Sequence, residues 1–290
     1  ETTPNGEARV CCLSNTLITQ PNGYPYNLKD HTLQEMFESD YMKNLRQDFL
    51  DGKKPSTCNK CWSVEEAGGK SKRILAYDML EYTKVFDKID YEDINPKTIQ
   101  FLDLKLGNIC NLKCRICGSW SSSKWAQEEL DYGENPVARK HLTEGGWPKK
   151  HPQFFEDVKE DLADAEYFEF TGGEPFMIRD HFKILMYCVE KGYAKNIDIH
   201  YNTNGTQLPP REIFDLWRYF KRVEIAFSID DVGEQFQYQR HPANWREVNH
   251  NLVQFKTYQT HNMEFQICTT ISIFNIFQFF KYLKKVDGWD

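Results

Sequence analysis

The sequence has no long apolar run and no excess of basic residues. None of its apolar stretches reaches the ~18 residues that a membrane-spanning helix needs, and the residues from Glu1 onward do not have the pattern of a signal peptide. The net charge at pH 7 is −7, so the chain does not carry the basic surplus that binds duplex nucleic acid. We therefore expect no membrane segment and no nucleic-acid partner.

The nine cysteines do not have the pattern of a disulfide framework. Most of them are clustered, several at CxxC-type spacing, in a chain of 290 residues, which indicates metal binding in a reducing compartment. We therefore predict a cytoplasmic protein. Cys188 and Cys268 stand alone in apolar helix and strand patterns, so we expect both in the core.

The most distinctive segment is 107–118, which reads Gly-Asn-Ile-Cys-Asn-Leu-Lys-Cys-Arg-Ile-Cys-Gly. Three and then two residues separate Cys110, Cys114 and Cys117, so their thiolates can converge on one metal centre, and an iron–sulfur cluster takes such ligands. The loop has no fourth Cys, which would leave one iron open, as in a catalytic metal site. Core cysteines or a zinc site are the alternatives.

From residue 99 onward, strand patterns alternate with helix patterns, which is typical of a parallel α/β fold. The Cys loop follows the end of the first strand, where barrel enzymes place their chemistry. We expect strands at 99–106, 165–170, 195–201, 222–229 and 263–271, and helices at 180–191, 210–220, 245–259 and 275–285. We interpret 131–153, which is rich in glycine, as a surface excursion.

A distinctive polar or glycine-rich motif follows each later strand. Gly172-Gly173-Glu174 follows the second strand, and glycine lets the backbone approach a ligand closely because it lacks Cβ. An Asn-Thr-Asn-Gly turn that contains Asn204 follows the third strand. Ser228 and Asp230, at the end of the fourth strand, share one strand face because side chains alternate, and their hydroxyl and carboxylate suit a ribose diol.

Two further polar positions lie beyond these motifs. The guanidinium of Arg240 matches a carboxylate as a fork, although a plain surface arginine is the alternative. Asn275, together with Ser272, follows the fifth strand.

The Cys110-x3-Cys114-x2-Cys117 spacing, with apolar Ile116 before the last Cys, resembles the signature of the radical S-adenosylmethionine (SAM) superfamily. The resemblance implies a 4Fe–4S cluster on the three cysteines, with the methionyl amino and carboxylate groups of SAM on the fourth iron. It also implies a partial (β/α)6 TIM-like barrel. The implied SAM-binding positions are Ile116, Gly172, Gly173, Glu174, Asn204, Ser228, Asp230, Arg240 and Asn275.

A second group of cysteines precedes this barrel pattern. The CxxC of Cys58 and Cys61 alone fits zinc, redox chemistry or an iron–sulfur cluster. The order Gly6-x4-Cys11, a gap and then this CxxC resembles the twitch domain, a shortened relative of the SPASM domain that binds an auxiliary 4Fe–4S cluster. The resemblance implies that Cys11, Cys58 and Cys61 are ligands, and zinc on the same thiolates remains an alternative. We expect Cys12 to be a buried or spare thiol.

These patterns predict three parts: a small α+β twitch domain at 1–73, a helical connector at 74–98 and a radical SAM barrel at 99–290. The sequence begins without Met and offers five β/α units, where the family has six. We therefore expect the twitch domain to be truncated at its N-terminus and the barrel to lack its last strand.

The resemblance implies a radical SAM enzyme, whose cluster reductively cleaves SAM to a 5′-deoxyadenosyl radical that abstracts hydrogen from a substrate. A peptide or protein is the expected substrate, and an electron donor such as flavodoxin or ferredoxin is the expected partner. Two alternatives stay open: a zinc-stapled binding module without catalysis, and a degenerate fragment that binds SAM without turnover.

Overall fold

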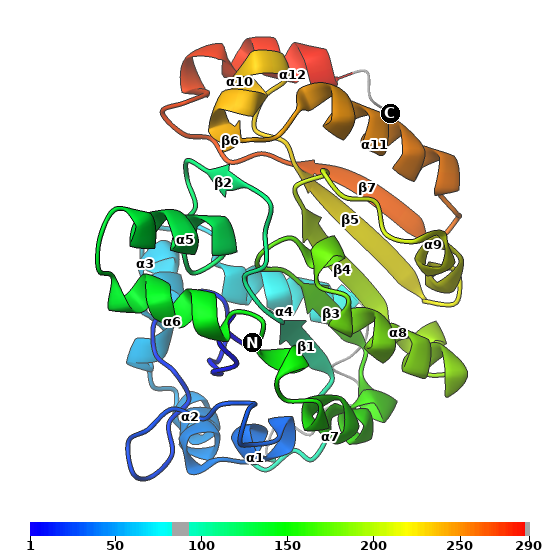
Figure 1. Ribbon diagram of the computed structural model, residues 1–290. Helices are drawn as coiled ribbons and strands as arrows, with labels where there is room; N and C mark the ends of the chain where they lie inside the picture. Colours follow the sequence, from blue (N-terminus) through cyan, green and yellow to red (C-terminus); the bar gives the residue numbers. More distant parts are fainter. Residues whose placement is uncertain (83–92, 288–290) are drawn as a thin grey trace. The chain divides into compact units, whose positions relative to one another are not determined.

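The computed structural model describes residues 1–82 and 93–287 (Figure 1). They form two compact units: Glu1 with Glu7–Ile99, and Thr2–Gly6 with Gln100–Asp290. The expected connector at 74–98 is helical at its start, in α4 (Lys72–Tyr82), and its residues 83–92 lie outside the described part of the chain.

The second unit is built on a five-stranded parallel sheet with the order β1-β3-β4-β5-β7. Its strands are β1 (Phe101–Leu104), β3 (Tyr167–Phe170), β4 (Asp198–Thr203), β5 (Arg222–Ser228) and β7 (Met263–Cys268). The five predicted strands are confirmed, and each lies beside the one before it in the sequence. Parallel neighbours need a crossover connection, and helical segments provide it, so the unit is an α/β partial barrel.

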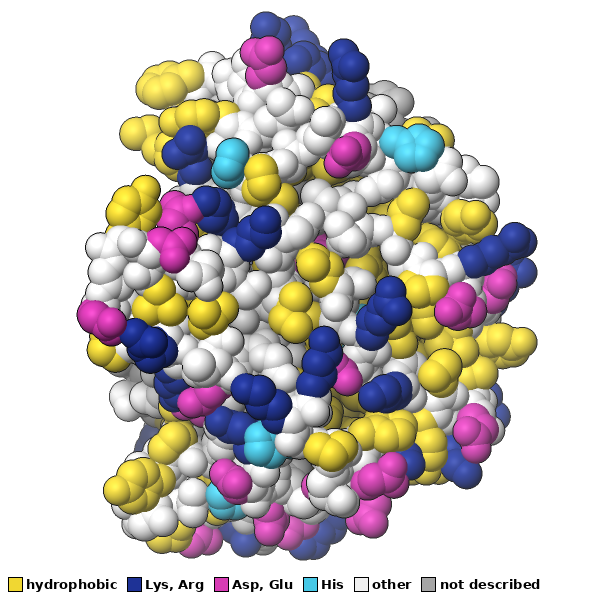
Figure 2. All heavy atoms as spheres, in the orientation of Figure 1, with side chains coloured by type: hydrophobic (Ala, Val, Ile, Leu, Met, Phe, Trp, Pro, Cys, Tyr) yellow, Lys and Arg dark blue, Asp and Glu magenta, His cyan; other side chains and the backbone are white. Residues whose placement is uncertain are grey.

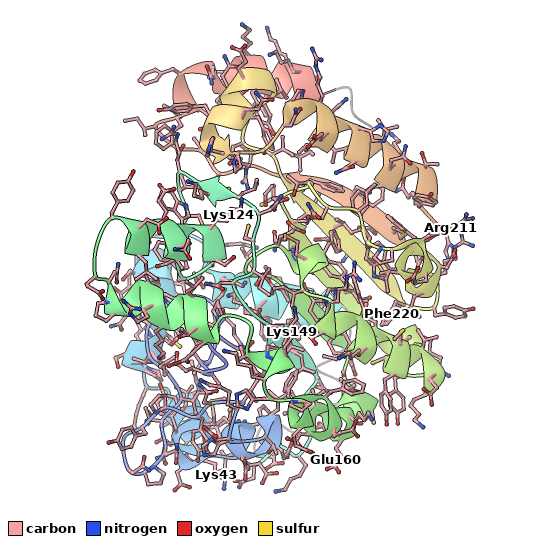
Figure 3. All side chains as sticks on the ribbon, in the orientation of Figure 1. Lys43, Lys124, Lys149, Glu160, Arg211 and Phe220 are labelled. Atoms are coloured by element: carbon pink, nitrogen blue, oxygen red, sulfur yellow. The ribbon has the colours of Figure 1, made fainter. Side chains whose placement is uncertain are left out.

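The crossover helices cover one face of this sheet (Figure 1). They are α8 (Asp180–Glu190), α9 (Arg211–Trp217) and α11 (Trp245–Tyr258), which confirms three predicted helices. Their aromatic side chains meet those of the strands: Tyr201 lies 5.5 Å from Trp217 and Phe227 lies 5.0 Å from Phe255, between ring centroids. Burial of each such side chain stabilises the fold by about 1.5–3 kcal/mol. Figure 3 labels exposed Arg211 at the start of α9 and buried Phe220 after its end.

The remaining elements of this unit are α5 (Ser123–Asp131), α6 (Pro136–Glu144), η3 (Trp147–Lys149), α7 (Gln153–Asp161), η4 (Leu162–Asp164), η5 (Pro175–Met177), η6 (Ala194–Asn196), α10 (Gly233–Gln239), η7 (Ile276–Gln278) and α12 (Phe279–Val286). The predicted helix at 275–285 is therefore confirmed as η7 followed by α12. A two-stranded antiparallel sheet joins β2 (Lys113–Cys114) to β6 (Arg240–His241), and the sequence patterns do not predict it.

Two expectations about this unit were wrong. The segment 131–153 is not a surface excursion, because it contains α6 and η3 and its Trp147 is fully buried beside Phe154. Lys149 of the same turn is exposed (Figure 3). Cys268 is exposed, because β7 buries Met263 and alternation places Cys268 on the opposite face. Cys188 is buried as expected.

The first unit contains α1 (Leu33–Phe37), α2 (Asp40–Leu50), η1 (Ser56–Cys58), α3 (Asn59–Glu66) and α4. The Ser39 side chain caps helix α2 by accepting a hydrogen bond from the Met42 backbone N–H. Isolated bridges such as Arg9 to Leu17 join the segments before α1.

No helix in the described residues is both long and apolar enough to cross a bilayer. On the face of the molecule that Figure 2 shows, basic and acidic side chains are interspersed and are not separated by sign.

Candidate metal and cofactor site

The loop with the three cysteines is fastened by its backbone to the segment before α11. Register pairs Cys114 with Arg240 and Lys113 with His241, and the Arg115 N–H donates to the Gln239 carbonyl over 2.9 Å. Main-chain pairing therefore places the middle cysteine beside an arginine that is far away in the sequence.

Asn108, which the sequence patterns do not single out, supports the start of this loop. It is buried, its backbone N–H donates to the Gly145 carbonyl over 2.9 Å, and its side-chain amide donates to the Ser119 carbonyl over 2.9 Å. Its own carbonyl accepts from the Ser123 N–H at the start of α5. Lys124, the next residue of α5, is exposed (Figure 3). The site therefore uses the segment misjudged as a surface excursion, because that segment supplies Gly145.

The Gly172-Gly173 turn packs directly against the Cys loop. The Glu174 N–H donates to the Ile109 carbonyl over 2.8 Å. Gly173 has φ +59°, and a Cβ built there would lie 2.9 Å from the Asn108 carbonyl carbon and would collide with the Ile109 carbonyl oxygen. Gly172 has φ +79°, in the left-handed region as well. Both glycines are therefore needed for the approach of the two backbones.

The carboxylate of Glu174 joins the second strand end to the third. It is fully buried and accepts from the Thr203 hydroxyl over 2.7 Å, from the Asn204 N–H over 2.8 Å and from the Phe176 N–H over 3.3 Å. Burial raises the pKa of Glu174 to about 7, and these three donors oppose that rise. Its side chain bonds within the protein, so its predicted contact with SAM stays a prediction.

The Asn204 side chain reaches the first cysteine. Its amide nitrogen lies 3.8 Å from the Cys110 sulfur and 3.2 Å from the Asn111 side-chain oxygen. The Thr206 hydroxyl lies 2.6 Å from the Asn204 side-chain oxygen and accepts from the Asn111 amide over 2.9 Å. The sequence patterns do not single out Asn111 and Thr206, although Asn111 lies inside the Cys motif and Thr206 directly follows the Asn-Gly turn.

Asp230 and Arg240 form a buried ion pair at the end of the fourth strand. The Arg240 Nε donates to one carboxylate oxygen of Asp230 over 2.8 Å, and the Thr270 N–H donates to the other over 2.9 Å. The guanidinium also lies 3.9 Å from the Cys114 sulfur, through Nη1. Asn275 donates to the carbonyls of Asp230 and Thr270 over 3.0 and 2.9 Å. Arg240 is therefore buried, and the alternative interpretation of it as a plain surface arginine is wrong.

Ser228 and Ile116 differ from these braced residues. Ser228 is half-buried and lies opposite Cys268 in the register of β5 and β7. Ile116 is 44% exposed in the Cys loop, so its apolar side chain is open to a ligand. Their predicted contacts with SAM remain predictions.

The thiols of the loop favour their neutral form unless a cation is present. Burial raises the pKa of Cys110 to about 12 and that of Cys114 to about 11, and Arg240 opposes the rise at Cys114. Burial also raises the pKa of Cys117. A bound metal offsets this cost, because a coordinating thiol is deprotonated.

No group of three or more His, Cys, Asp or Glu side chains in the described ranges could hold a single metal ion. A cluster does not require such convergence, since each thiolate binds a different iron. The chemistry of the three thiols and the donors at their sulfurs therefore fits an iron–sulfur cluster.

In the first unit, Cys58 ends η1 and Cys61 lies buried in α3. Burial is the largest cause of the raised pKa of Cys58, and the charges of Cys11 and Cys61 raise it further. Arg73 lowers it. Cys11 and Cys61 thus each lie close enough to Cys58 to affect its thiol.

The model of the radical SAM superfamily matches residues 104–270. The search of curated proteins gave no match.

Similar solved structures include native anSMEcpe with bound AdoMet (TM-score 0.45, 23% identity, covering 65% of this chain and 49% of that one). Native anSMEcpe with bound AdoMet and Cp18Cys peptide has a TM-score of 0.43 and 22% identity, covering 65% of this chain and 48% of that one. Streptococcus suis SuiB bound to S-adenosylmethionine has a TM-score of 0.38 and 14% identity, covering 99% of this chain and 61% of that one. The chain therefore spans about half the length of anSMEcpe.

Proposed function

The chain belongs to the radical SAM superfamily, and from this premise we propose that it is an enzyme that binds a 4Fe–4S cluster through Cys110, Cys114 and Cys117. One observation carries the proposal most: three thiols lie in a loop that is held by the ends of neighbouring parallel strands, with a donor at two of the sulfurs. When bound, the cluster and SAM would supply one-electron cleavage of SAM and a radical that removes hydrogen from a substrate.

The protein's own residues would bind, orient and exclude water around these cofactors. The backbone of the Gly172-Gly173 turn is proposed to contact the methionyl amino group, and exposed Ile116 offers an apolar contact. Ser228 and Asp230 are proposed for the ribose, with Asn275 behind them on the adenine side. Glu174, Asn204 and Arg240 complete the proposed set.

We propose a peptide or protein substrate, on the resemblance of the N-terminal cysteines to the twitch domain. The substrate would lie against the face of the sheet that α8, α9 and α11 leave uncovered. A row of half-buried polar side chains crosses that face, where His200 lies in register with Glu169 and Glu224 and bonds to Glu224 over 2.7 Å. Such groups can fix a polar backbone by hydrogen bonds.

The first unit would bind an auxiliary 4Fe–4S cluster through Cys11, Cys58 and Cys61. Cys11 and Cys61 both contribute to the raised pKa of Cys58, which supports the assignment. A flavodoxin or ferredoxin would supply the electron for the barrel cluster, which suits a cytoplasmic protein.

The test compares Cys114→Ala with Cys188→Ala in anaerobically reconstituted protein. Cys188 is a buried thiol outside the site and serves as the matched control. Cys114→Ala should lose the reducible cluster and all SAM cleavage and keep the iron of the first unit, whereas Cys188→Ala should behave as the parent protein. Iron and sulfide content, electron paramagnetic resonance (EPR) of the reduced protein and release of 5′-deoxyadenosine measure this.

Other results would select the alternatives. A colourless protein with zinc and no iron indicates a stapled binding module. A protein that holds the cluster and binds SAM without cleaving it indicates a degenerate fragment. Unchanged SAM cleavage in Cys114→Ala refutes the assignment of the cluster ligands.

A further inference from the structure

We propose that Arg240 is a positioning residue that sets the reduction potential of the barrel cluster, by donating from its guanidinium to the Cys114 sulfur while Asp230 holds it in place. This inference rests on the proposed function, because it takes Cys114 as a cluster ligand. It differs from the role that the sequence predicts for Arg240, which is to pair with a carboxylate of the ligand.

The position of the guanidinium is fixed from two directions. The antiparallel pairing of β2 with β6 sets the Arg240 backbone directly opposite that of Cys114. The Asp230 carboxylate accepts from Nε over 2.8 Å, which leaves Nη1 directed at the sulfur over 3.9 Å. Only 8% of Arg240 and 2% of Asp230 is exposed, so water does not screen either charge effectively.

Asp230 is itself held, so the arginine has little freedom to turn away. The Thr270 N–H occupies the second carboxylate oxygen, and Asn275 bonds the backbone carbonyls of both residues. Asn275 is buried and uses its own side-chain oxygen to accept from the Ser272 N–H over 2.8 Å. A series of hydrogen bonds therefore runs from Thr270, after β7, through Asp230 and Arg240 to the sulfur of Cys114.

The electrostatic consequence follows from the charge of the two redox states. Reduction adds one negative charge to an iron–sulfur cluster, and a hydrogen bond to a ligand sulfur stabilises that charge and raises the potential. A buried guanidinium does so more strongly than a neutral amide, since charge-assisted hydrogen bonds are roughly twice as strong. Arg240 contacts Cys114, whereas the neutral amide of Asn204 contacts Cys110. Asp230 opposes the effect through its own negative charge.

This arrangement predicts shifts of opposite sign for the two partners. Arg240→Gln should lower the ratio of reduced to oxidised cluster at a fixed applied potential by tenfold or more, and tenfold is about 59 mV for one electron. Asp230→Asn removes the negative charge and keeps one oxygen that can accept from the Arg240 Nε, so it should raise that ratio. Arg240→Lys keeps the charge without the fork and should fall between the parent protein and Arg240→Gln.

Arg115→Gln is the matched control. Arg115 lies in the same loop, but its guanidinium stacks on Tyr238 at 3.9 Å and donates to the Tyr238 carbonyl, and no contact of it with a sulfur exists in the described residues. Its removal should change the ratio less than twofold.

The experiment is a redox titration of the whole chain followed by EPR, without SAM, with iron counted in every sample and SAM affinity measured separately. A parent-like ratio in Arg240→Gln that retains its iron overturns the inference, and so does a loss of SAM affinity without a shift in potential. If Arg240→Gln does not retain the cluster, Arg240→Lys and Asp230→Asn still decide the matter by the sign of their shifts. Failure of the parent protein to bind any cluster would refute the proposed function instead.

Discussion

The two groups of cysteines in this chain are held in different ways. In the barrel unit, Cys110 and Cys114 receive side-chain donors from Asn204 and Arg240, residues that are about a hundred positions away and that follow other strands. A buried ion pair with Asp230 and backbone pairing fix Arg240, and the Asn204 N–H donates to the Glu174 carboxylate.

In the first unit, hydroxyl groups hold the cysteine segments together. The Ser14 hydroxyl lies 2.7 Å from that of Thr57, and Thr57 lies 2.5 Å from the hydroxyl of Thr16. Because Ser14 also donates its N–H to the Cys11 carbonyl and Thr57 precedes Cys58, this cluster joins the turns that carry two predicted ligands. In the barrel unit a buried charge, Arg240, therefore faces one sulfur and a neutral amide faces another, whereas hydroxyl groups join the turns of the other cysteine group.

The largest effect should be the loss of iron from one cysteine group while the other group keeps its cluster. A Cys58→Ala/Cys61→Ala variant should lose the iron of the first unit completely and retain the barrel cluster, together with SAM cleavage within twofold of the parent protein. The reason is that the proposed function assigns radical generation to Cys110, Cys114 and Cys117 alone. Iron content, EPR and 5′-deoxyadenosine release check it, with Cys12→Ala as the control. A parallel loss of both clusters in a folded protein would contradict separate roles.

The next effect concerns stability at low pH, because among the described residues only the barrel unit contains a fully buried histidine. Burial lowers the pKa of His181 to about 3, although a hydrogen bond to the Ile178 carbonyl opposes it. The unfolded chain binds the proton near pH 6.5, so the stabilisation is present above that pH and is lost as the pH falls toward 3, by roughly 4 kcal/mol.

Hydrogen exchange at pH 7 and pH 4 should therefore show protection falling more in β3 and β4 than in α2. His181→Gln should reduce this dependence on pH, since the amide does not titrate. Equal loss of protection in both units would show that His181 does not cause the difference.

A smaller effect is expected at Glu174. Glu174→Gln should destabilise the barrel by about 1–3 kcal/mol at pH 8. An amide nitrogen cannot accept a hydrogen bond, so at least one of the three donors that bond to Glu174 would lose its acceptor. The raised pKa of Glu174, about 7, means that the parent protein loses stability as the pH rises from about 4.5 to 7, and the variant should lack this slope. Chemical denaturation at several pH values measures both. Glu160→Gln, at an exposed residue labelled in Figure 3, is the control and should change stability by less than about 0.5 kcal/mol.

The smallest effect should come from the hydroxyl cluster. Ser14→Ala should cost about 1 kcal/mol, since it removes the bond to Thr57 and one to the Thr16 carbonyl over 3.0 Å. We expect faster amide hydrogen exchange between Cys11 and Cys58 and lower iron occupancy of the first unit, with the barrel cluster unchanged. Ser63→Ala, at an exposed helical serine, controls for loss of a hydroxyl. Full occupancy and protection in Ser14→Ala would show that the cluster does not organise the ligands.

The sequence alone was sufficient for the parallel strands, the crossover helices and the place of the Cys loop after the first strand. These features depend on alternation, helical spacing and motif position, all of which are local properties of the chain. The same local reasoning failed for 131–153 and Cys268, because glycine content does not show that Trp147 packs against Phe154, and an apolar pattern does not show which face of an edge strand is covered.

Only the tertiary structure decided what the polar residues at the strand ends contact. Glu174, Arg240 and Asn275 are buried and bonded to groups from other strands. A buried charge or amide requires a partner because the interior does not solvate it, and that partner can lie anywhere in the sequence. Sequence spacing cannot identify such partners, since the parallel sheet brings its strand ends together only after every crossover has formed.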